Sequence, residues 1–274
     1  MKTILGLLFI SVLFSSPVFA ADTGPNNYHV QIVAKKNGAT VSLYAHLIDC
    51  TEATITLTMS LEDMTAVPPV PLTVDSLGKQ DFLLTTIHPT VPKKAHKYSY
   101  QYHSQIGRRL PLAPFPVTYA LPYVDQEFTV LQGPLGKFSH NEGSSNENAV
   151  AWDMPIGTTV CAARGGIVVA LRQDSDVGGK DEKYVHDANH VVIKHDDNTF
   201  AEYSHLKKGS LLVTLGQKVK IHEPLGESGN TGFSSSPHLH FAVYYTLDGS
   251  TRKTIPIQFA TKTGNVTLKA GDRY

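Results

Sequence analysis

The segment from Ser236 to Tyr245 constrains the fold of this chain more than any other. It reads Ser-Pro-His-Leu-His-Phe-Ala-Val-Tyr-Tyr, so two histidines two residues apart lead into an alternating apolar run. Side chains of a β-strand point to opposite faces in turn, which predicts His238 and His240 on one face and Phe241 on the other. A strand that holds two imidazoles side by side above an apolar face is suited to a metal site.

Short alternating segments in the first half of the chain predict a small β-sandwich, for which an immunoglobulin-like arrangement is one option. Three prolines at positions 68, 69 and 71 exclude a central strand there. Tyr98, Tyr100 and Tyr102 share one strand face, and we expect them to pack across strands rather than form a platform for a sugar or peptide. The expected strands cover residues 28–34, 39–47, 53–59 and 97–103.

A second, larger β-rich unit follows, and no helical period of useful length appears after the first twenty residues. Gly165 and Gly166 predict a bulge or bend. The predicted fold class is therefore all-β, with an N-terminal β-sandwich-like domain and a C-terminal antiparallel β-sheet domain. The expected strands of this second unit cover residues 158–171, 190–195, 200–206 and 238–245, with shorter pieces at 255–259 and 266–269.

The first twenty residues have the pattern of an export signal. Lys2 supplies the charged start, residues 4–14 form an apolar stretch too short to span a bilayer, and Val18-Phe19-Ala20 gives a small-residue cleavage pattern. We expect cleavage between Ala20 and Ala21, and hence a periplasmic or secreted protein. No later segment is apolar enough to predict a membrane span.

The predicted domains are residues 1–20 as the signal peptide, 21–115 as the N-terminal β-rich domain and 116–274 as the second domain. The segment from Arg108 to Pro116 contains three prolines and is typical of an extended connector. With 24 basic and 24 acidic residues, the chain gives no indication of nucleic acid or an anionic membrane as a partner.

Two cysteines, Cys50 and Cys161, lie far apart in the sequence. In an oxidising compartment they could form a disulfide, but sequence does not define the geometry that a disulfide needs. Cys161 stands in Val-Cys-Ala-Ala, which is typical of a small buried strand residue. Both alternatives stay open from the sequence.

A catalytic zinc site needs three protein ligands from histidine, aspartate, glutamate or cysteine and an open position for water. There are thirteen histidines, so most are expected to be structural or exposed. His190 and His195 flank a predicted strand and are expected at surface or packing positions. Those without an evident clustered partner in the sequence are His29, His46, His88, His96, His103, His186 and His222.

Six short motifs in a fixed order carry a resemblance to a known family. The chain resembles the lysostaphin/LytM-type zinc metallopeptidases, which cleave peptides of peptidoglycan, over about residues 121–245. The combination of motifs is specific, although each motif alone is weak. The motifs are Ser139-His140, Ala151-Trp-Asp-Met-Pro-Ile-Gly157, Ala163-Arg-Gly-Gly166, Tyr203-Ser-His-Leu206, Ser228-Gly-Asn-Thr-Gly232 and Pro237-His-Leu-His-Phe241.

The resemblance implies a LytM-type antiparallel β-sheet domain with a groove across one face and one Zn²⁺ per chain. Carried over residue by residue, the implied metal ligands are His140, Asp153 and His240, and the implied catalytic imidazoles are His205 and His238. Twelve residues separate His140 from Asp153, where the family more commonly has a much shorter loop. The other departure is the serine that precedes the Pro-His-Leu-His-Phe motif, where a glycine is usual.

The predicted function is that of an exported zinc metalloendopeptidase acting on stem or cross-link peptides of bacterial peptidoglycan. Two imidazoles and a carboxylate leave a zinc site positively charged, which lowers the pKa of a bound water towards about 7. One alternative is a non-catalytic LytM-type activator of a cell-wall hydrolase, and another is a zinc peptidase acting on secreted proteins. A serine peptidase, suggested by Gly226-Glu-Ser-Gly229, is disfavoured because the segment is not G-x-S-x-G.

Overall fold

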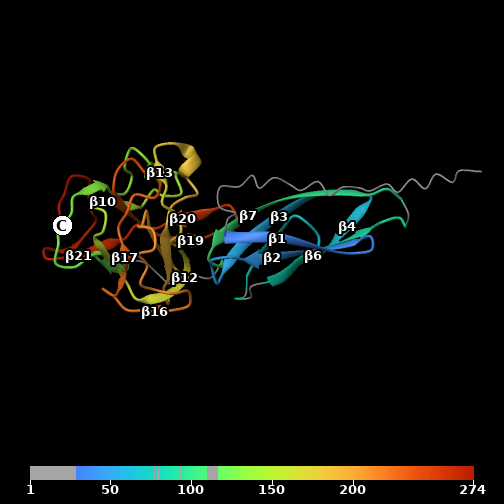
Figure 1. The fold of residues 1–274 in the computed structure, drawn as a ribbon, viewed down its shortest axis with the longest axis horizontal. Coiled ribbons are helices and arrows are strands. Elements are labelled where there is room, and N and C mark those ends of the chain that lie inside the picture. Colours follow the sequence, from blue (N-terminus) through green and yellow to red (C-terminus); the bar gives the residue numbers. More distant parts are fainter. Residues whose placement is uncertain (1–28, 77, 79–80, 93, 110–116) are drawn as a thin grey trace, which may run out of the picture.

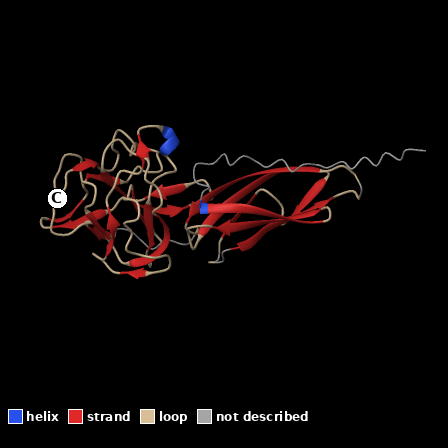
Figure 2. Cartoon of the chain, in the orientation of Figure 1, coloured by secondary structure: helices blue, strands red, loops and turns tan. Residues whose placement is uncertain are grey.

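The computed structural model describes residues 29–76, 78, 81–92, 94–109 and 117–274. The predicted export signal and most of the predicted connector lie outside the described residues. Figure 1 shows two lobes that follow one another along the long axis of the molecule, and Figure 2 shows that both consist of strands joined by loops, with almost no helix. The predicted all-β class is confirmed, and the described part of the chain contains no helix long and apolar enough to cross a membrane.

The N-terminal lobe consists of two antiparallel sheets whose apolar faces share one core. Strand β2 shows why, because its residues alternate between buried and half-buried, with Leu43 and Ala45 fully inside. One sheet has the order β1 (Val30–Asn37), β2 (Thr40–Leu47), β6 (Asp81–Pro89) and β4 (Met64–Val67). The other has the order β5 (Leu72–Asp75), β3 (Ala53–Glu62) and β7 (Lys97–Ile106).

Two details of this lobe agree with the sequence analysis. The proline-rich segment follows β4, which is an edge strand of its sheet, as expected for residues that cannot donate a ladder hydrogen bond. Tyr98, Tyr100 and Tyr102 are partly buried against the N-terminal core, so the packing interpretation is confirmed.

The C-terminal lobe is organised around an eight-stranded antiparallel sheet with β19 near its centre. The predicted strand over 158–171 is wrong as a single element, because the chain turns near Gly165 and Gly166 and its two parts join different sheets. The sheet has the order β16 (Lys218–Val219), β12 (Gly166–Arg172), β14 (His190–Lys194), β15 (Phe200–Ser204), β19 (His238–Thr246), β10 (Val150–Asp153) and β9 (Val130–Gln132), with β20 (Arg252–Thr254) paired to β19.

Small sheets complete the C-terminal lobe around this central one. They are β8 (Thr118–Ala120) with β21 (Gln258–Thr261) and β22 (Gly264–Val266), β11 (Thr159–Cys161) with β17 (Pro224–Glu227), and the parallel pair β13 (Gly178–Gly179) and β18 (Gly232–Phe233). A short 3₁₀ helix, η2 (Glu182–Tyr184), follows β13.

The two faces of the central sheet have different environments. On the inner face, Trp152 lies opposite Leu239 and Tyr203 opposite Phe241, and all four are buried in one apolar core. Because side chains alternate along a strand, the positions between them, including His240, lie on the outer face. The register of β19 therefore separates the core from the face that carries the histidines.

The N-terminal lobe is joined to this outer face by backbone as well as side-chain contacts. Cys50 forms an isolated antiparallel bridge with Ala170 of β12, and the amide of Thr51 donates to the carbonyl of Val169 at 2.7 Å. Glu52 is buried between Lys194 and Arg108, with both cations 3.0 Å from its carboxylate.

Cys50 and Cys161 are both buried and free, and the strand position predicted for Cys161 is confirmed.

Candidate functional site

A row of aligned residues crosses the outer face of the central sheet. His190 of β14 pairs with Ser204 of β15, Ser204 pairs with His240 of β19, and His240 pairs with Ala151 of β10. Directly paired residues of neighbouring antiparallel strands point to the same face, so His190 and His240 share the surface formed by this row. Strand β15 lies between their two strands and is hydrogen-bonded to both, which gives both imidazoles a rigid base.

Four histidines gather at this face. The ring centroids of His140 and His240 are 5.3 Å apart, those of His205 and His238 are 4.4 Å apart, and those of His205 and His240 are 6.0 Å apart. His140 comes from the loop between β9 and β10, and His205 directly follows β15 with a φ of 67°. The structure thus brings together four of the five residues that the resemblance singled out, although they come from separate parts of the chain.

Backbone carbonyls fix the orientation of three of these rings. The Nδ1 atoms of His140, His205 and His238 lie 3.2, 2.7 and 2.8 Å from the carbonyl oxygens of Gly133, Thr231 and Ser236. A carbonyl only accepts, so each Nδ1 carries the proton and donates it, which leaves the lone pair on Nε2. The Nε2 atom of His140 is buried and has no hydrogen-bond partner among the described residues. A backbone carbonyl that accepts a hydrogen bond from Nδ1 commonly imposes this tautomer on histidines that bind a metal or transfer a proton.

Burial keeps the imidazoles neutral at physiological pH. Desolvation lowers the pKa of His205 to about 3 and that of His240 well below its ordinary value, with further lowering from the neighbouring imidazoles. Desolvation also lowers the pKa values of His140 and His238; for His238, the backbone bond to Ser236 and the nearby Asp153 act in the opposite direction. A neutral imidazole can bind a metal ion or accept a proton.

Asp153 differs from the other two predicted metal ligands because its side chain is exposed. It ends β10, pairs with His238 on the same face of the sheet, and has an exposed side chain. Across the part of the chain that the structure describes, no three histidine, cysteine, aspartate or glutamate side chains already converge to hold a metal ion. His140, Asp153 and His240 fit zinc in donor type, and the buried Nε2 of His140, which has no hydrogen-bond partner among the described residues and lies beside His240, is suited to bind a cation. The metal assignment stays a prediction.

The comparison with known families identifies this region. Residues 145–254 match peptidase family M23. This part of the chain is an M23 domain. Asp153, His205, His238 and His240 fall within the matched residues, whereas His140 precedes them.

Relatives of the M23 domain include two named endopeptidases. The chain is 39% identical over 94 residues to the peptidoglycan DD-endopeptidase ShyA of Vibrio cholerae, covering 34% of this chain and 19% of ShyA. It is 31% identical over 107 residues to the glycyl-glycine endopeptidase ALE-1 of Staphylococcus capitis, covering 39% of this chain and 26% of ALE-1. The chain therefore spans only a minor part of these relatives. The lysostaphin catalytic domain of Staphylococcus simulans, a solved structure, shares 26% identity over 47% of this chain and 87% of that one, with a TM-score of 0.32.

A buried ion pair lies beside the imidazoles of the M23 domain. Glu202 of β15 accepts a hydrogen bond from the Ser204 hydroxyl at 2.7 Å and pairs with Arg252, which also donates to Asn146 at 2.9 Å. Burial raises the pKa of Glu202, but the attraction of Arg252 and of the nearby imidazoles outweighs it and holds the pKa below its usual range. Glu202 therefore stays ionised beside the imidazoles.

A second histidine pair, which the sequence analysis missed, lies at the junction of the two lobes. The sequence shows no evident clustered partner for His29 and predicts a structural or exposed position; His29 is buried in a structural position, with a histidine neighbour that the sequence did not reveal. Its Nδ1 lies 2.6 Å from the carboxylate of Asp49, and its ring is 5.2 Å from that of His190. Desolvation lowers the pKa of the buried His190 to about 4. No local signal could have revealed the pair, because its members come from different lobes.

The M23 domain and the N-terminal lobe together line one groove with a volume of about 1340 Å³. Its floor includes His140, His205, His238 and His240, but Asp153 is not among its lining residues. The N-terminal lobe contributes side chains from the start of β1 and the end of β7. These are His29, Gln105 and Ile106. The N-terminal lobe therefore forms one wall of the groove.

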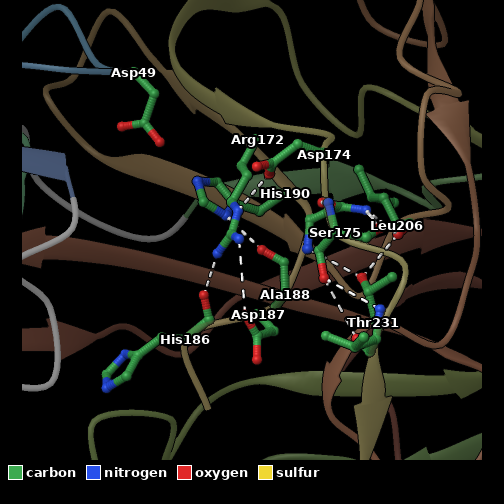
Figure 3. Close-up of polar contacts among 12 residues, drawn as sticks. Asp49, Arg172, Asp174, Ser175, His186, Asp187, Ala188, His190, Leu206 and Thr231 are labelled. Atoms are coloured by element: carbon green, nitrogen blue, oxygen red, sulfur yellow. Dashed lines mark hydrogen bonds and ion pairs between the residues drawn. The ribbon is translucent and has the colours of Figure 1, made fainter. Parts of the chain in front are cut away.

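The segment 173–187 contributes Lys180 and Val185 to the lining of the groove and is anchored at both ends. Arg172 donates to the main-chain carbonyl of His186 across the base of the segment (Figure 3). The side-chain amide of Asn189 donates to the carbonyl of Ser175 at 2.8 Å, and β13 pairs with β18 in the middle of the segment. Polar contacts thus hold this wall beside the imidazoles.

Ser228, the residue behind the serine-peptidase alternative, has a structural role. Its side chain is buried, its hydroxyl donates to the carbonyl of Pro155, and the same oxygen accepts from the amide of Thr158 at 3.1 Å. A hydroxyl engaged in this way inside a turn is not available as a nucleophile.

Proposed function

We propose that this chain is an exported zinc metalloendopeptidase that hydrolyses peptide bonds in bacterial peptidoglycan. The observation that carries the proposal is the cluster of four neutral imidazoles, three of them oriented by backbone carbonyls, inside a groove of an M23 domain. The naming of relatives as peptidoglycan DD-endopeptidases supports the substrate class.

We assign one Zn²⁺ to His140, Asp153 and His240. A zinc ion bound there would supply Lewis acidity, which polarises a peptide carbonyl and makes a water molecule more acidic. The chain supplies the orientation of the ligands. Gly133 fixes the ring of His140 through Nδ1, and the ladder between β15 and β19 fixes the backbone of His240.

His205 and His238 are assigned to proton transfer and to orientation of the substrate. Each presents Nε2 with its lone pair, because Nδ1 is committed to a backbone carbonyl. One of the two accepts a proton as a water oxygen bonds to the carbonyl carbon. The imidazolium so formed delivers this proton to the leaving nitrogen as the carbon–nitrogen bond breaks, so that a carboxylate and an amine leave the groove. The second imidazole orients the substrate through a hydrogen bond that its Nε2 lone pair accepts.

The test is digestion of purified peptidoglycan sacculi by the zinc-loaded full chain, with mass spectrometry of the muropeptides and a metal assay on the same sample. We expect new amino and carboxyl termini within the peptides and intact glycan strands. His238→Ala serves as the matched control and should release no fragments while retaining zinc. Unchanged sacculi with the zinc-loaded wild-type chain would contradict the proposal, and stimulation of a second hydrolase would favour the activator alternative.

Export has its own test. We expect N-terminal sequencing of the protein recovered from the periplasm or medium of the producing bacterium to begin at Ala21. Recovery only from the cytoplasm, with Met1 or Lys2 at the start, would contradict this part of the proposal.

A further inference from the structure

More positively than negatively charged side chains line the groove. The lining residues include four cations, Lys137, Lys180, Arg252 and Lys253, and two carboxylates, Glu147 and Glu202. Glu202 is neutralised by Arg252, and Glu147 accepts a hydrogen bond from the amide of Gly143 at 2.9 Å. The groove thus has an excess of positive charge, although the whole chain has equal numbers of basic and acidic residues.

Three of these cations are available to an occupant. Lys137, Lys180 and Lys253 are exposed, and none forms an ion pair with a carboxylate of the described residues. They come from three separate walls: the loop before His140, the segment after β13, and strand β20. An extended occupant would therefore meet ammonium groups at several points along its length.

The remaining surface of the groove indicates the size of the side chains that it takes. Its rim carries exposed apolar side chains, of which Phe138 is 87% exposed. Between them lie small hydroxyl side chains, among them Ser144, Ser145 and Ser235. Apolar contacts together with small donors suit a peptide with short side chains. The exposed apolar residues of the rim are Leu131, Phe138, Val185, Phe233 and Leu247.

We propose that the groove selects peptides that carry free carboxylates, and discriminates against uncharged peptides such as glycine chains, through Lys137, Lys180 and Lys253. This inference rests on the proposed function and names the substrate class of the same groove. Ammonium groups near a protein surface attract a carboxylate over several ångströms, and salt screens the attraction. The selection should therefore weaken at high ionic strength.

The experiment measures binding and cleavage separately on the zinc-loaded full chain. The binding probes are a fluorescently labelled Ala-Glu-Ala-Ala peptide with free carboxylates, the same peptide with both carboxyls as amides, and labelled pentaglycine amide, which should bind like the amidated peptide. At low salt we expect the acid to bind about tenfold more tightly than the amide, and at high salt the difference should shrink to about twofold. Cleavage is measured on cross-linked muropeptides with free or amidated carboxyls.

Lysine variants locate the selection in the groove. Lys180→Gln and Lys253→Gln should each weaken binding of the acid by about threefold and leave binding of the amide unchanged. Lys269→Gln is the matched control, because Lys269 is exposed in the same lobe and is not among the groove-lining residues. It should change neither value.

The outcomes separate the two proposals. Equal binding of acid and amide, no detectable binding of either, or equal effects of the groove variants and Lys269→Gln would overturn the selectivity inference, whether or not muropeptides are cleaved. Preferred binding of the acid without any cleavage would support the selectivity inference and overturn the peptidase proposal.

Discussion

The two ends of the outer face of the central sheet are built from the same strands and have opposite roles. At one end, Phe200, Tyr244 and Val192 are fully buried in the core of the N-terminal lobe. At the other end, a few residues along the same strands, His190 and His240 line the groove. Strand alternation places both sets on one face, and the N-terminal lobe decides which part of that face is covered. The same strands therefore carry the residues that stabilise the contact between the lobes and the residues of the candidate site. The N-terminal lobe contacts both groups.

Removal of residues 21–115 should have the largest effect, because it takes away the lobe that covers one end of the outer face. It uncovers the aromatic rings of Phe200 and Tyr244, which stack at 5.6 Å, and leaves Lys194 without Glu52. We expect loss of soluble, folded protein, because a large exposed apolar patch promotes aggregation. Soluble yield and circular dichroism measure the effect. A soluble fragment with higher activity than the full chain would instead mean that the N-terminal lobe covers the groove.

Substitution of the histidines that line the groove, at the end of the outer face that the N-terminal lobe leaves uncovered, should remove activity without loss of the fold. His205→Ala and His238→Ala are expected to lower the turnover rate by about 10²-fold or more, as is typical when a general acid–base group is lost. The free energy of unfolding should change far less than the activation free energy. His96→Ala in the N-terminal lobe is the control, since His96 bonds only to the nearby carbonyl of Lys94 in the contacts described. Normal turnover by both groove variants would exclude them from the chemistry.

Substitution at the end that the N-terminal lobe covers should lower the stability of the protein with little effect on its activity. Phe200→Ala is expected to lower the free energy of unfolding by about 3–5 kcal/mol, because it leaves a cavity between the lobes. Phe200→Leu keeps most of the volume and should cost less. Urea unfolding gives the free energies, and turnover per folded molecule at low temperature should stay within about twofold of wild type. A large loss of turnover with unchanged stability would show that the two ends are not separable.

A buried histidine away from the groove gives the smallest expected effect. His195 donates through Nδ1 to the carbonyl of Gly165 at 2.8 Å, and desolvation lowers its pKa from 6.5 to about 4. Between these values the unfolded chain binds a proton that the folded chain excludes, so stability falls as the pH drops through this window, by up to about 1.4 kcal/mol per pH unit. His195→Gln should show a shallower decline of the urea midpoint between pH 7 and pH 5. An unchanged slope would contradict this role.

The parts that could be predicted from sequence depend on local pattern or on motifs. The alternation after His240 predicts β19 and its inner face correctly, and the motifs identify the four clustered histidines although these come from three distant segments of the chain. The contact between His29 and His190 depends on how two lobes pack, which no local period encodes. The position of the Asp153 carboxylate depends on side-chain rotation at the end of a strand, which residue spacing does not define.

The most direct test of the central claim is the zinc content of the purified full chain, measured by mass spectrometry of the metal. We predict one zinc per chain in the wild type and in His238→Ala. His140→Ala, Asp153→Ala and His240→Ala should each have lost it. A wild-type chain that binds no zinc, or a His240→Ala variant that binds it as tightly as wild type, would contradict the claim.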